Sequence, residues 1–491
     1  MKRRELLGAG LALAACAPLR GWSAVLGNAG DVAAKSLDGK DLVLRGSDVA
    51  DLAARMRGDV LLSGHEDYES ARHTWNGMFD RHPALIARCT GASDVQDAVN
   101  FAREHGLLTA VRAGGHSVSG KSSVDGGLVI DLQEMQGVHV DPAAKRAMLQ
   151  AGSLLGLLDH ECARHGLATP VGTFSITGAA GLTLGGGFGR LGRRFGLACD
   201  NVASFDVVTA DGRFLRASDA ENPDLFWGLR GGGGNFGVVT SIEYRLHPVN
   251  PVIFGGMVIW PYEQARDAVR LFRDVAIKAP DEVNLQPVWF WEKGQPRFGV
   301  EVCWSGDHAA GDAWLKPLRE FGKPAFDDVA PMPFVKIQSS GDSAFPDGTC
   351  AYAKNGFVGS LSDDGIDLML DVFRRTPNLY TMFMDPCGGA YARVPLEATA
   401  FPRRDMAFIL AIWSGWRERA GADAKVEQMR GIWRELEPLT QGFYTNYEGK
   451  DTADARYREN FGPNLDRLVA LKAKYDSGNL FRLNANVPAK L

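Results

Sequence analysis

Apolar runs bounded by glycine or polar turns alternate with helix-like spacings along the first half of the chain. Short apolar runs predict strands, and apolar residues three or four positions apart predict helices. The helices predicted in this way are 94–105, which Ser93 would cap, and 154–165, which Gly166 would end. The strands are 84–89, 107–112, 127–132, 146–151, 202–209, 214–217 and 238–246. This alternation of strands and helices predicts one domain.

The pattern changes after the last of these strands. Pro248 and Pro251 interrupt the chain, and we place a domain boundary there. Beyond it, strands such as 252–260 and 408–413 alternate with helices such as 262–278. This part of the chain predicts a second domain of the α+β class.

The second domain contains two tryptophans at alternate positions, Trp289 and Trp291. A strand would place both rings on one face, because successive side chains of a strand point to opposite faces. The rings either line a pocket for a ring or a sugar, or pack beneath the helices of the domain. The sequence leaves both interpretations open.

Glycine is the residue that adds most to this picture. It makes up 58 of 491 residues, above the average share of about 7%. The glycines cluster at 172–196 and 231–237 instead of recurring at a fixed period, which excludes collagen-like and low-complexity chains. Because glycine has no Cβ, such blocks allow the backbone to lie directly against a bound group.

Composition and charge narrow the class of partner. The chain is 45% hydrophobic and 23% charged, as in ordinary globular proteins, and its length suits two or at most three domains. The formal net charge is -5, so the chain lacks the excess of basic residues that neutralises nucleic-acid phosphates. A nucleic-acid partner is therefore not expected.

The cysteines give no metal site. None of the six that follow Cys16 has a C-x-x-C or comparable spacing, so no bound metal is predicted. Their apolar surroundings favour buried free thiols over disulfides. They are Cys89, Cys162, Cys199, Cys303, Cys350 and Cys387.

The N-terminus has the pattern of an export signal. The basic residues 2–4 precede an apolar stretch at 8–17 that is too short to span a bilayer, so no transmembrane segment is predicted. The paired arginines favour the twin-arginine pathway over the general secretory one, and the protein is expected to be periplasmic or secreted. Cleavage after Ala24 competes with a lipoprotein-like site at Cys16, which would carry a lipid anchor, and the choice stays open.

The segment 111–120, VRAGGHSVSG, leaves a predicted strand and at once loses most of its side chains. Its backbone N–H groups can therefore turn toward an anion such as a diphosphate. Residues 115–122 also match the P-loop pattern, which requires a helix directly after the loop. A predicted strand follows instead, so a nucleoside triphosphatase is not expected.

Seven segments carry further information through their order and spacing. They are 112–117 (RAGGHS), 172–181 (GTFSITGAAG), 184–191 (LGGGFGRL), 195–201 (FGLACDN), 226–240 (FWGLRGGGGNFGVVT), 444–447 (YTNY) and 479–486 (NLFRLNAN). With them, the chain resembles the berberine bridge enzyme-like flavoproteins of the vanillyl-alcohol oxidase superfamily over about residues 70–490. The resemblance implies the α+β class, with a discontinuous two-part FAD-binding domain of the vanillyl-alcohol oxidase type and an α+β substrate domain with an antiparallel sheet.

The domains implied follow from the positions of these segments. The expected parts are an export signal at 1–24, an N-terminal extension at 25–70, an FAD-binding domain at 71–250, a substrate-binding domain at 251–435 and a C-terminal return to the FAD-binding domain at 436–491.

The resemblance also implies the residues that hold the cofactor. His116 would bond through a ring nitrogen to the 8-methyl carbon of the flavin, so covalent FAD is expected. Some relatives form a second bond through a cysteine where this chain has Phe174, so a second link is not expected. The other residues implied in FAD binding are Arg112, Ala113, Gly114, Gly115, Ser117, Gly120, Gly172, Thr173, Thr177, Gly178, Gly181, Gly186, Gly189, Val239, Asn446, Asn484 and Asn486.

Two tyrosines are the candidate catalytic residues, because relatives place a tyrosine of the 444–447 segment over the flavin. Oxidation of an alcohol needs a base for the hydroxyl proton, and Tyr444 or Tyr447 would be that base. A tyrosine of ordinary pKa about 10 needs a cation or another polarising group beside it. By charge alone the candidates for this role are Lys354, Arg393 and Arg456, which are otherwise solvated surface residues. Some plant relatives have another tyrosine where this chain has Phe195, so that base is absent here.

The function expected is that of an exported FAD-linked oxidase or dehydrogenase, of the alcohol-oxidising or the bond-forming type. It would oxidise a C–OH or similar C–H group of a small organic substrate by hydride transfer to the flavin, and molecular oxygen would then become hydrogen peroxide. Two alternatives stay open. One is a dehydrogenase with another electron acceptor, and the other is a non-catalytic exported binding protein that keeps the flavin fold.

Overall fold

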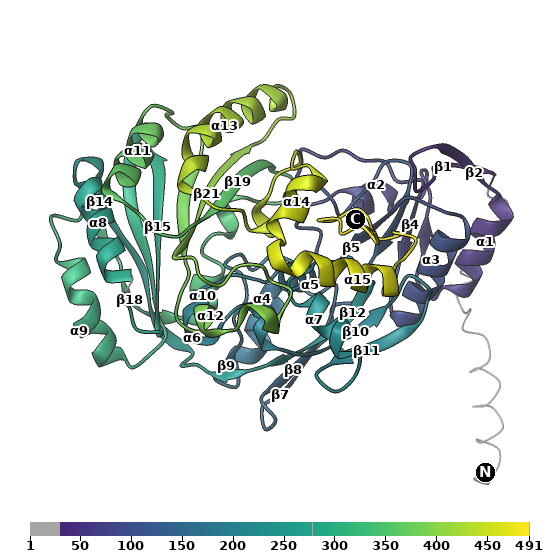
Figure 1. The fold of residues 1–491 in the computed structure, drawn as a ribbon, viewed down its shortest axis with the longest axis horizontal. Helices are drawn as coiled ribbons and strands as arrows, with labels where there is room; N and C mark the ends of the chain where they lie inside the picture. Colours follow the sequence, from purple (N-terminus) through teal and green to yellow (C-terminus); the bar gives the residue numbers. More distant parts are fainter. Residues whose placement is uncertain (1–29, 277, 491) are drawn as a thin grey trace, which may run out of the picture.

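The computed structural model describes residues 30–276 and 278–490, which form two lobes lying side by side (Figure 1). The predicted export signal at 1–24 and Cys16 lie outside the described residues. Each lobe is built around its own hydrophobic core, one with residues from both ends of the described chain and one with residues from its middle. Both cores combine helices with sheets, which confirms the predicted α+β class.

The first lobe contains two sheets of four and five strands and two small strand pairs. Its strands are β1 (Val32–Lys35), β2 (Asp41–Leu44), β3 (Val60–Leu61), β4 (Leu85–Arg88), β5 (Thr109–Arg112), β6 (Leu128–Asp131), β7 (Val138–Asp141), β8 (Arg146–Gln150), β9 (Leu167–Ala168), β10 (Val202–Val208), β11 (Phe214–Ser218), β12 (Val238–Arg245) and β13 (His247–Pro248). The four-stranded sheet has the order β3-β4-β6-β5 and is parallel along β4, β6 and β5. The five-stranded sheet has the order β11-β10-β12-β8-β7 and is antiparallel.

Helices from both ends of the described chain belong to this lobe. They are α1 (Gly46–Arg55), α2 (Tyr68–Arg72), α3 (Ala92–Glu104), α4 (Leu155–Ala163), α5 (Ala179–Leu184), α6 (Gly192–Phe195), α7 (Pro223–Leu229), α14 (Asp454–Asn460) and α15 (Leu465–Tyr475). Tyr457 of α14 and Leu468 of α15 are buried in the same core as Leu52 of α1. The chain therefore leaves this lobe after β13 and returns to it after its middle part (Figure 1).

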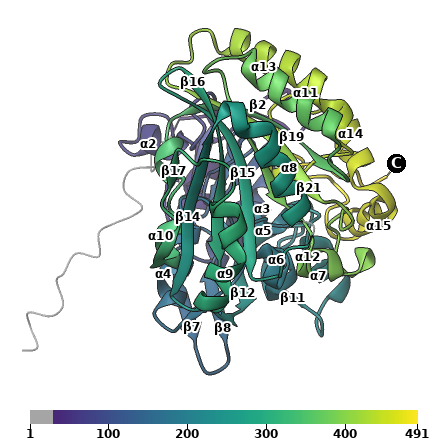
Figure 2. The same cartoon turned by 90° about the vertical axis from the view of Figure 1, so that its left-hand side faces the viewer.

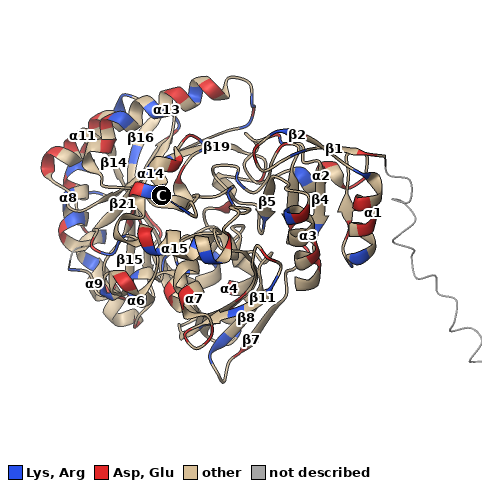
Figure 3. Ribbon diagram, turned by 45° about the vertical axis from the view of Figure 1, so that its right-hand side comes forward, with Lys and Arg blue, Asp and Glu red and all other residues tan. Residues whose placement is uncertain are grey.

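The second lobe is one antiparallel sheet with helices on its outer face (Figures 1 and 2). Its strands are β14 (Val252–Pro261), β15 (Val283–Glu292), β16 (Gln295–Trp304), β17 (Phe326–Asp327), β18 (Ala330–Pro333), β19 (Cys350–Val358), β20 (Thr381–Pro386) and β21 (Phe408–Trp416), and they run in the order β17-β14-β16-β15-β20-β21-β19 with β18 paired to β14. The outer helices are α8 (Ala265–Ala276), α9 (His308–Arg319), α11 (Asp363–Arg374) and α13 (Ala422–Leu436), and the short helices α10 (Phe334–Gln338) and α12 (Ala390–Arg393) complete the lobe. Acidic and basic residues alternate along α13, whereas α11 carries four aspartates and ends at Arg374 (Figure 3).

Alternation along β15 decides the role of its tryptophans. Trp289 is fully buried in the core beneath the helices, and the Trp291 ring stacks on Phe373 of α11 with ring centroids 5.6 Å apart. Gln286 and Val288 lie at the other set of alternate positions along the strand. They therefore point to the opposite face of the sheet, where they line a cavity. The interpretation of the tryptophans as a packing face is therefore correct, and the pocket interpretation is wrong.

Most of the elements predicted from the pattern are present, with one local difference at the start of a helix. Helix α3 begins at Ala92, so Ser93 lies within the helix and does not cap it. No helix follows the loop at 113–127, because β6 begins at Leu128, and this confirms that the P-loop match is coincidental. All six cysteines of the described residues are buried and free. Among the described residues no helix is long and apolar enough to cross a membrane.

Candidate active site

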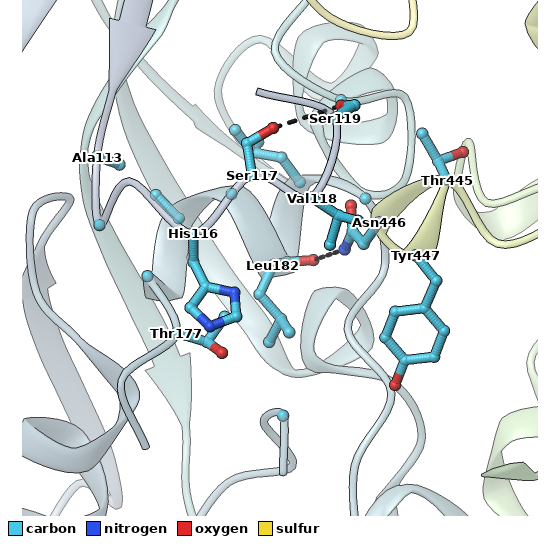
Figure 4. Close-up of a pocket in the computed structure, with 18 of the residues that line it drawn as sticks. Ala113, His116, Ser117, Val118, Ser119, Thr177, Leu182, Thr445, Asn446 and Tyr447 are labelled. Atoms are coloured by element: carbon cyan, nitrogen blue, oxygen red, sulfur yellow. Dashed lines mark hydrogen bonds between the residues drawn. The ribbon is translucent and has the colours of Figure 1, made fainter. Parts of the chain in front are cut away.

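A cavity of about 450 Å³ lies between the two lobes. Its wall in the first lobe consists of the loop after β5, the segment leading into α5, the glycine run before β12 and the C-terminal segment. Its wall in the second lobe is the inner face of the large sheet. Figure 4 shows His116 and Tyr447 entering the cavity from separate segments, with Thr177 beside the imidazole ring.

Two glycine loops of the first lobe meet back to back at this cavity. A Cβ on Gly114 would lie 2.3 Å from the Cα atom of Gly178, and Gly115 has a φ angle of +73°. A side chain at Gly114 would collide with backbone, and the positive φ at Gly115 is one that other residues rarely adopt. Both loops therefore present backbone to the cavity.

Most of the cofactor-binding residues expected from the sequence line this cavity. They are Ala113, Gly114, Gly115, His116, Ser117, Gly172, Thr173, Thr177, Gly178, Gly181, Val239, Asn446 and Asn484. Residues 231–234 line it as well, although only Val239 was expected to do so in that segment. The signal for them was in the sequence, because four consecutive glycines leave the backbone bare just before a strand.

Five expected residues lie behind the wall, namely Arg112, Gly120, Gly186, Gly189 and Asn486. A Cβ on Gly189 would lie 1.6 Å from the carbonyl oxygen of Val171, and one on Gly186 would lie 2.7 Å from the Phe401 ring. Close packing of the protein against itself thus accounts for these two glycines. The Arg112 guanidinium donates a hydrogen bond to the carbonyl oxygen of Ala71. These five residues do not line the cavity, and their contact with a cofactor stays a prediction.

His116 presents a neutral imidazole to the cavity. Its ring stacks on the indole of Trp75, with ring centroids 4.0 Å apart and an angle of 19° between the planes. Its Nε2 atom is buried and has no hydrogen-bond partner among the described residues. Burial lowers the pKa of His116 to about 4, so at neutral pH the ring carries one proton and one free lone pair.

The two candidate tyrosines have different surroundings. Tyr447 lines the cavity, whereas Tyr444 does not. The Tyr444 hydroxyl accepts hydrogen bonds from the Gly187 N–H at 3.0 Å and from Asn446 Nδ2 at 2.7 Å. Asn446 also donates to the carbonyl oxygen of Leu182 at 2.9 Å (Figure 4). Tyr444 therefore ties the C-terminal segment to the α5 region, and Tyr447 is the tyrosine that faces the cavity.

Asp385 of β20 lies next to Tyr447. Burial is the first cause that raises the pKa of Tyr447 well above its ordinary value, and the charge of Asp385 is the second. Gln286 Nε2 donates a hydrogen bond of 2.5 Å to Oδ1 of Asp385, whereas Oδ2 is buried and accepts none from the described residues. Burial raises the pKa of Asp385 to about 6, so the carboxylate is ionised above that pH and has an oxygen free to receive a proton.

None of the three cations expected beside a tyrosine lies at the cavity. Lys354 pairs with Glu448 on the outer side of the sheet, and Arg393 and Arg456 form exposed ion pairs. The expectation that one of them polarises a tyrosine is wrong for this structure, because their side chains point away from the site. The interpretation of Arg393 and Arg456 as surface charges is confirmed.

A different cation, Arg190, lines the cavity. Its side chain is 2% exposed and forms a bidentate ion pair with Glu301, with Nε–Oε1 at 2.8 Å and Nη2–Oε2 at 3.0 Å. Arg190 also donates to Gln338 Oε1 at 3.2 Å, and both members of the ion pair line the cavity. The sequence placed Arg190 inside a matched segment, but nothing in the sequence showed that β16 would bring Glu301 to it.

Several aromatic rings also line the cavity. They belong to Phe174, Phe345, Phe383 and Trp413, and the polar side chains among them are Gln286, Glu301 and Thr381. The Phe174 ring lies 6.5 Å from the His116 ring, centroid to centroid. None of the six described cysteines lines the cavity, so the described residues offer no thiol for a second covalent link there. They also contain no cluster of three or more His, Cys, Asp or Glu side chains that would hold a metal ion.

Comparison with known proteins assigns this geometry to a family. A family model described as an FAD binding domain matches residues 83–218, and one described as berberine and berberine like matches residues 443–488. An FAD-linked oxidoreductase of Dictyostelium discoideum is 30% identical over 446 residues, which cover 89% of this chain and 96% of that protein. The chain belongs to the berberine bridge enzyme-like family of FAD-linked oxidoreductases.

Solved structures of two oxidases share the fold of this berberine bridge enzyme-like chain. The structure of 6-hydroxy-D-nicotine oxidase from Arthrobacter nicotinovorans superposes with a TM-score of 0.81 and 27% identity, over 89% of this chain and 98% of the other. The carbohydrate oxidase from Microdochium nivale gives a TM-score of 0.80 and 25% identity, over 90% of this chain and 99% of the other. These comparisons confirm the predicted fold, with its FAD-binding and substrate parts.

The flavin side of the cavity fits FAD, the cofactor of this family. A Cβ on Gly181 would meet no atom within 4 Å, so the chain leaves space against the α5 backbone. Two buried polar atoms of cavity-lining residues have no partners among the described residues, His116 Nε2 and Asn484 Oδ1, and they indicate that a ligand completes the site. Lys121 lines the same side, and its Nζ donates to the carbonyl oxygen of Asn484 at 2.6 Å. Burial lowers the pKa of Lys121 to about 8, and an anionic diphosphate beside it would offset that effect.

Proposed function

We propose that this FAD-dependent oxidoreductase is an exported oxidase that acts on a C–OH group, or a similar C–H group, of a small organic substrate. The pairing of Tyr447 with Asp385 at the cavity carries the proposal, because oxidation of an alcohol needs a base for the hydroxyl proton. Both solved relatives named above are oxidases, which supports oxygen as the electron acceptor.

The roles of the side chains follow from their positions. When bound, the flavin supplies the redox step by accepting a hydride from the substrate carbon. Tyr447 Oη takes the hydroxyl proton of the substrate and passes its own proton to Oδ2 of Asp385. Because its pKa is raised, Tyr447 is protonated before the reaction, so its two proton transfers occur together. Gln286 fixes Oδ1 of Asp385 and thereby keeps Oδ2 available for the proton.

The remaining cavity residues support a particular kind of substrate. The rings of Phe174, Phe345 and Trp413 suit the flat apolar face of a ring. The Glu301 carboxylate, held in place by Arg190, suits a hydroxyl or amine hydrogen-bond donor at the other side of the substrate. The proposed substrate is therefore a ring compound with an oxidisable hydroxyl group near Tyr447 and a second donor toward Glu301.

Anaerobic mixing followed by admission of air tests this function. A screen of ring alcohols should identify a substrate that bleaches the flavin absorbance, and air should restore it within seconds while releasing hydrogen peroxide equal to the substrate consumed. Slow reoxidation in air with fast reoxidation by another acceptor would identify a dehydrogenase. A purified protein without flavin absorbance would instead favour the non-catalytic binding protein.

Covalent attachment through His116 is the second part of the proposal. The free nitrogen of the neutral imidazole would bond to the 8-methyl carbon of the flavin, while one methyl C–H bond and the N–H bond of the ring lose their protons. The two electrons released by this oxidation would pass with two protons to dioxygen, which becomes hydrogen peroxide. A single link is proposed, because Phe174 offers no nucleophile.

Acid denaturation tests the link. The yellow colour should stay with the precipitated wild-type protein, and the His116→Ala protein should release all of its flavin to the supernatant. Flavin released completely from the wild-type precipitate would show that the cofactor is bound without a covalent bond.

Export is proposed from residues 1–24 alone, with the twin-arginine pathway favoured by their paired arginines. A covalent cofactor suits this location, since flavin lost outside the cytoplasm is not replaced. Cell fractionation should find the flavin-loaded protein outside the cytoplasm, and replacement of both arginines by lysine should leave it inside.

A further inference from the structure

A short segment before the FAD-binding loops ties the two lobes together at His116. The Trp75 N–H donates to the carbonyl oxygen of Gly115 at 3.2 Å. The Asn76 side chain donates to the carbonyl oxygens of Val118 and Ala351, both at 2.8 Å, and accepts from the Ala351 N–H at 2.9 Å. The segment thus bonds the loop that carries His116 on one side and strand β19 of the second lobe on the other.

The Trp75 ring is fixed within this segment. It is 5% exposed and packs in a small core with Val118, Ala351 and Trp413. Its Nε1 donates to the carbonyl oxygen of Phe345 at 3.0 Å. One face of the indole is left for the His116 imidazole, which stacks on it at 4.0 Å.

Stacking is the interaction that orients the imidazole. Among the described residues, His116 Nε2 has no hydrogen-bond partner. Metal-bound and catalytic histidines are usually oriented by a hydrogen bond from the other ring nitrogen, but no such bond to another residue of the described chain is present here. The rings next to it belong to Trp75 and Phe174, and burial is the cause of its lowered pKa. Without Trp75 the ring would be free to turn about its side-chain bonds and to take up water.

We propose that Trp75 is a positioning residue for flavin attachment, which holds the His116 imidazole at the angle from which its free nitrogen reaches the 8-methyl carbon. The inference rests on the covalent link of the proposed function. The bond formed would be the one between His116 nitrogen and that carbon, the bonds broken would be a methyl C–H and the N–H of the ring, and the two electrons and two protons would leave with dioxygen as hydrogen peroxide. Misorientation of a reacting atom by about 1 Å lowers a rate by roughly a hundredfold, so a single stacking ring is enough to control this step.

The test measures attachment directly. Apoprotein is mixed with FAD in air, and the fraction of flavin that stays with the acid precipitate is followed with time. The Trp75→Leu and Trp75→Met proteins should still bind FAD, seen by quenching of its fluorescence, but should attach it at least about tenfold more slowly than wild type. The Trp75→Phe protein should attach it at close to the wild-type rate, because an aromatic face remains. The Trp291→Leu protein is the matched control, since it loses an indole of the second lobe that stacks on Phe373 and does not line the cavity, and should attach FAD normally.

The outcomes separate the inference from the proposed function. Flavin released from acid-precipitated wild type overturns the covalent link itself. A wild type that retains flavin, together with a Trp75→Leu or Trp75→Met protein that attaches it at the wild-type rate, overturns the role of Trp75.

A measurement on the wild type tests the buried, neutral imidazole on which the role of Trp75 depends. Under the Trp75 ring the imidazole stays neutral down to pH 5, because burial lowers its pKa to about 4, so the attachment rate should change little between pH 8 and pH 5. A rate that falls by half near pH 6.5, the ordinary pKa of histidine, would contradict the proposed arrangement.

Discussion

The Tyr447→Phe enzyme should lose roughly a hundred- to ten-thousand-fold in kcat while keeping its flavin and its fold. Tyr447 faces the cavity next to Asp385, and phenylalanine removes the only hydroxyl of that pair without changing the shape of the ring. Its Cβ and ring would still pack edge-on against Trp413, with ring centroids 5.6 Å apart. Stopped-flow measurement of flavin bleaching under anaerobic conditions isolates the chemical step from reoxidation.

The Tyr444→Phe enzyme is the matched control for this prediction. Tyr444 is buried in the same segment, but its hydroxyl binds the Gly187 N–H and Asn446 and does not line the cavity. Its loss should lower the melting temperature and leave the rate of flavin bleaching within a fewfold of wild type. Equal losses of rate in the two variants would show that neither tyrosine is specifically the proton acceptor.

The pH profile reports on Asp385. Burial raises its pKa to about 6, and the proton acceptor has to be ionised, so kcat/KM should fall with decreasing pH through about 6. The Asp385→Asn enzyme should lose both the activity and this limb of the profile. Its stability should be retained or increased at pH 8, because a carboxyl whose folded pKa lies above the ordinary 3.8 costs stability as the pH rises through 6. A profile that stays flat to pH 4 in the wild type would exclude Asp385 as the acceptor.

The Arg190→Met protein should lose about 3–5 kcal/mol of unfolding free energy. The variant leaves the Glu301 carboxylate, 12% exposed, without its bidentate partner in the cavity wall. It also removes the donor to Gln338, which in turn donates to Asp159 at 3.1 Å. Chemical unfolding followed by tryptophan fluorescence gives the change, provided that flavin content is matched between the proteins.

Two further variants show whether the loss comes from the buried charge. In the Arg190→Met/Glu301→Leu protein no unpaired charge remains, so much of the lost stability should return. The Arg266→Met protein removes an equally bidentate ion pair, with Asp367 at 2.5 Å, but both of those side chains are nearly half exposed. It should leave the unfolding free energy nearly unchanged. A double variant that is no more stable than Arg190→Met would assign the effect to lost packing of the long arginine side chain.

The flavin side of the site was predictable from the sequence because it is built from local backbone. Gly114 and Gly115 turn a loop away from β5 within a few residues, and His116 follows in the same turn. The glycine runs, the loop that carries His116 and the Tyr447 segment are each contiguous motifs, so one stretch of sequence carries each of them. At Gly186 and Gly189 the atom that excludes a Cβ belongs to the protein itself, so packing alone requires a glycine at each position.

The substrate side was not predictable, because its residues meet only through strand pairing. Gln286 and Asp385 are held in one hydrogen bond by the pairing of β15 with β20, and Glu301 reaches Arg190 from β16 across the two lobes. Lys354, one of the cations expected beside a tyrosine, does not reach the cavity, because strand alternation points it to the outer face of the sheet. Its neighbour Asn355 points inward and binds Tyr444.

By itself the sequence determined the class of the fold, and it placed the glycine loops, His116 and the tyrosine segment as candidates for the flavin site, since the conformations of these segments depend on their own residues. Only the tertiary structure decided which tyrosine faces the cavity, which carboxylate lies beside it, and which ring stacks on His116. Strand register and the contact between two lobes set those distances, and a one-residue change in register would turn every one of those strand side chains to the opposite face.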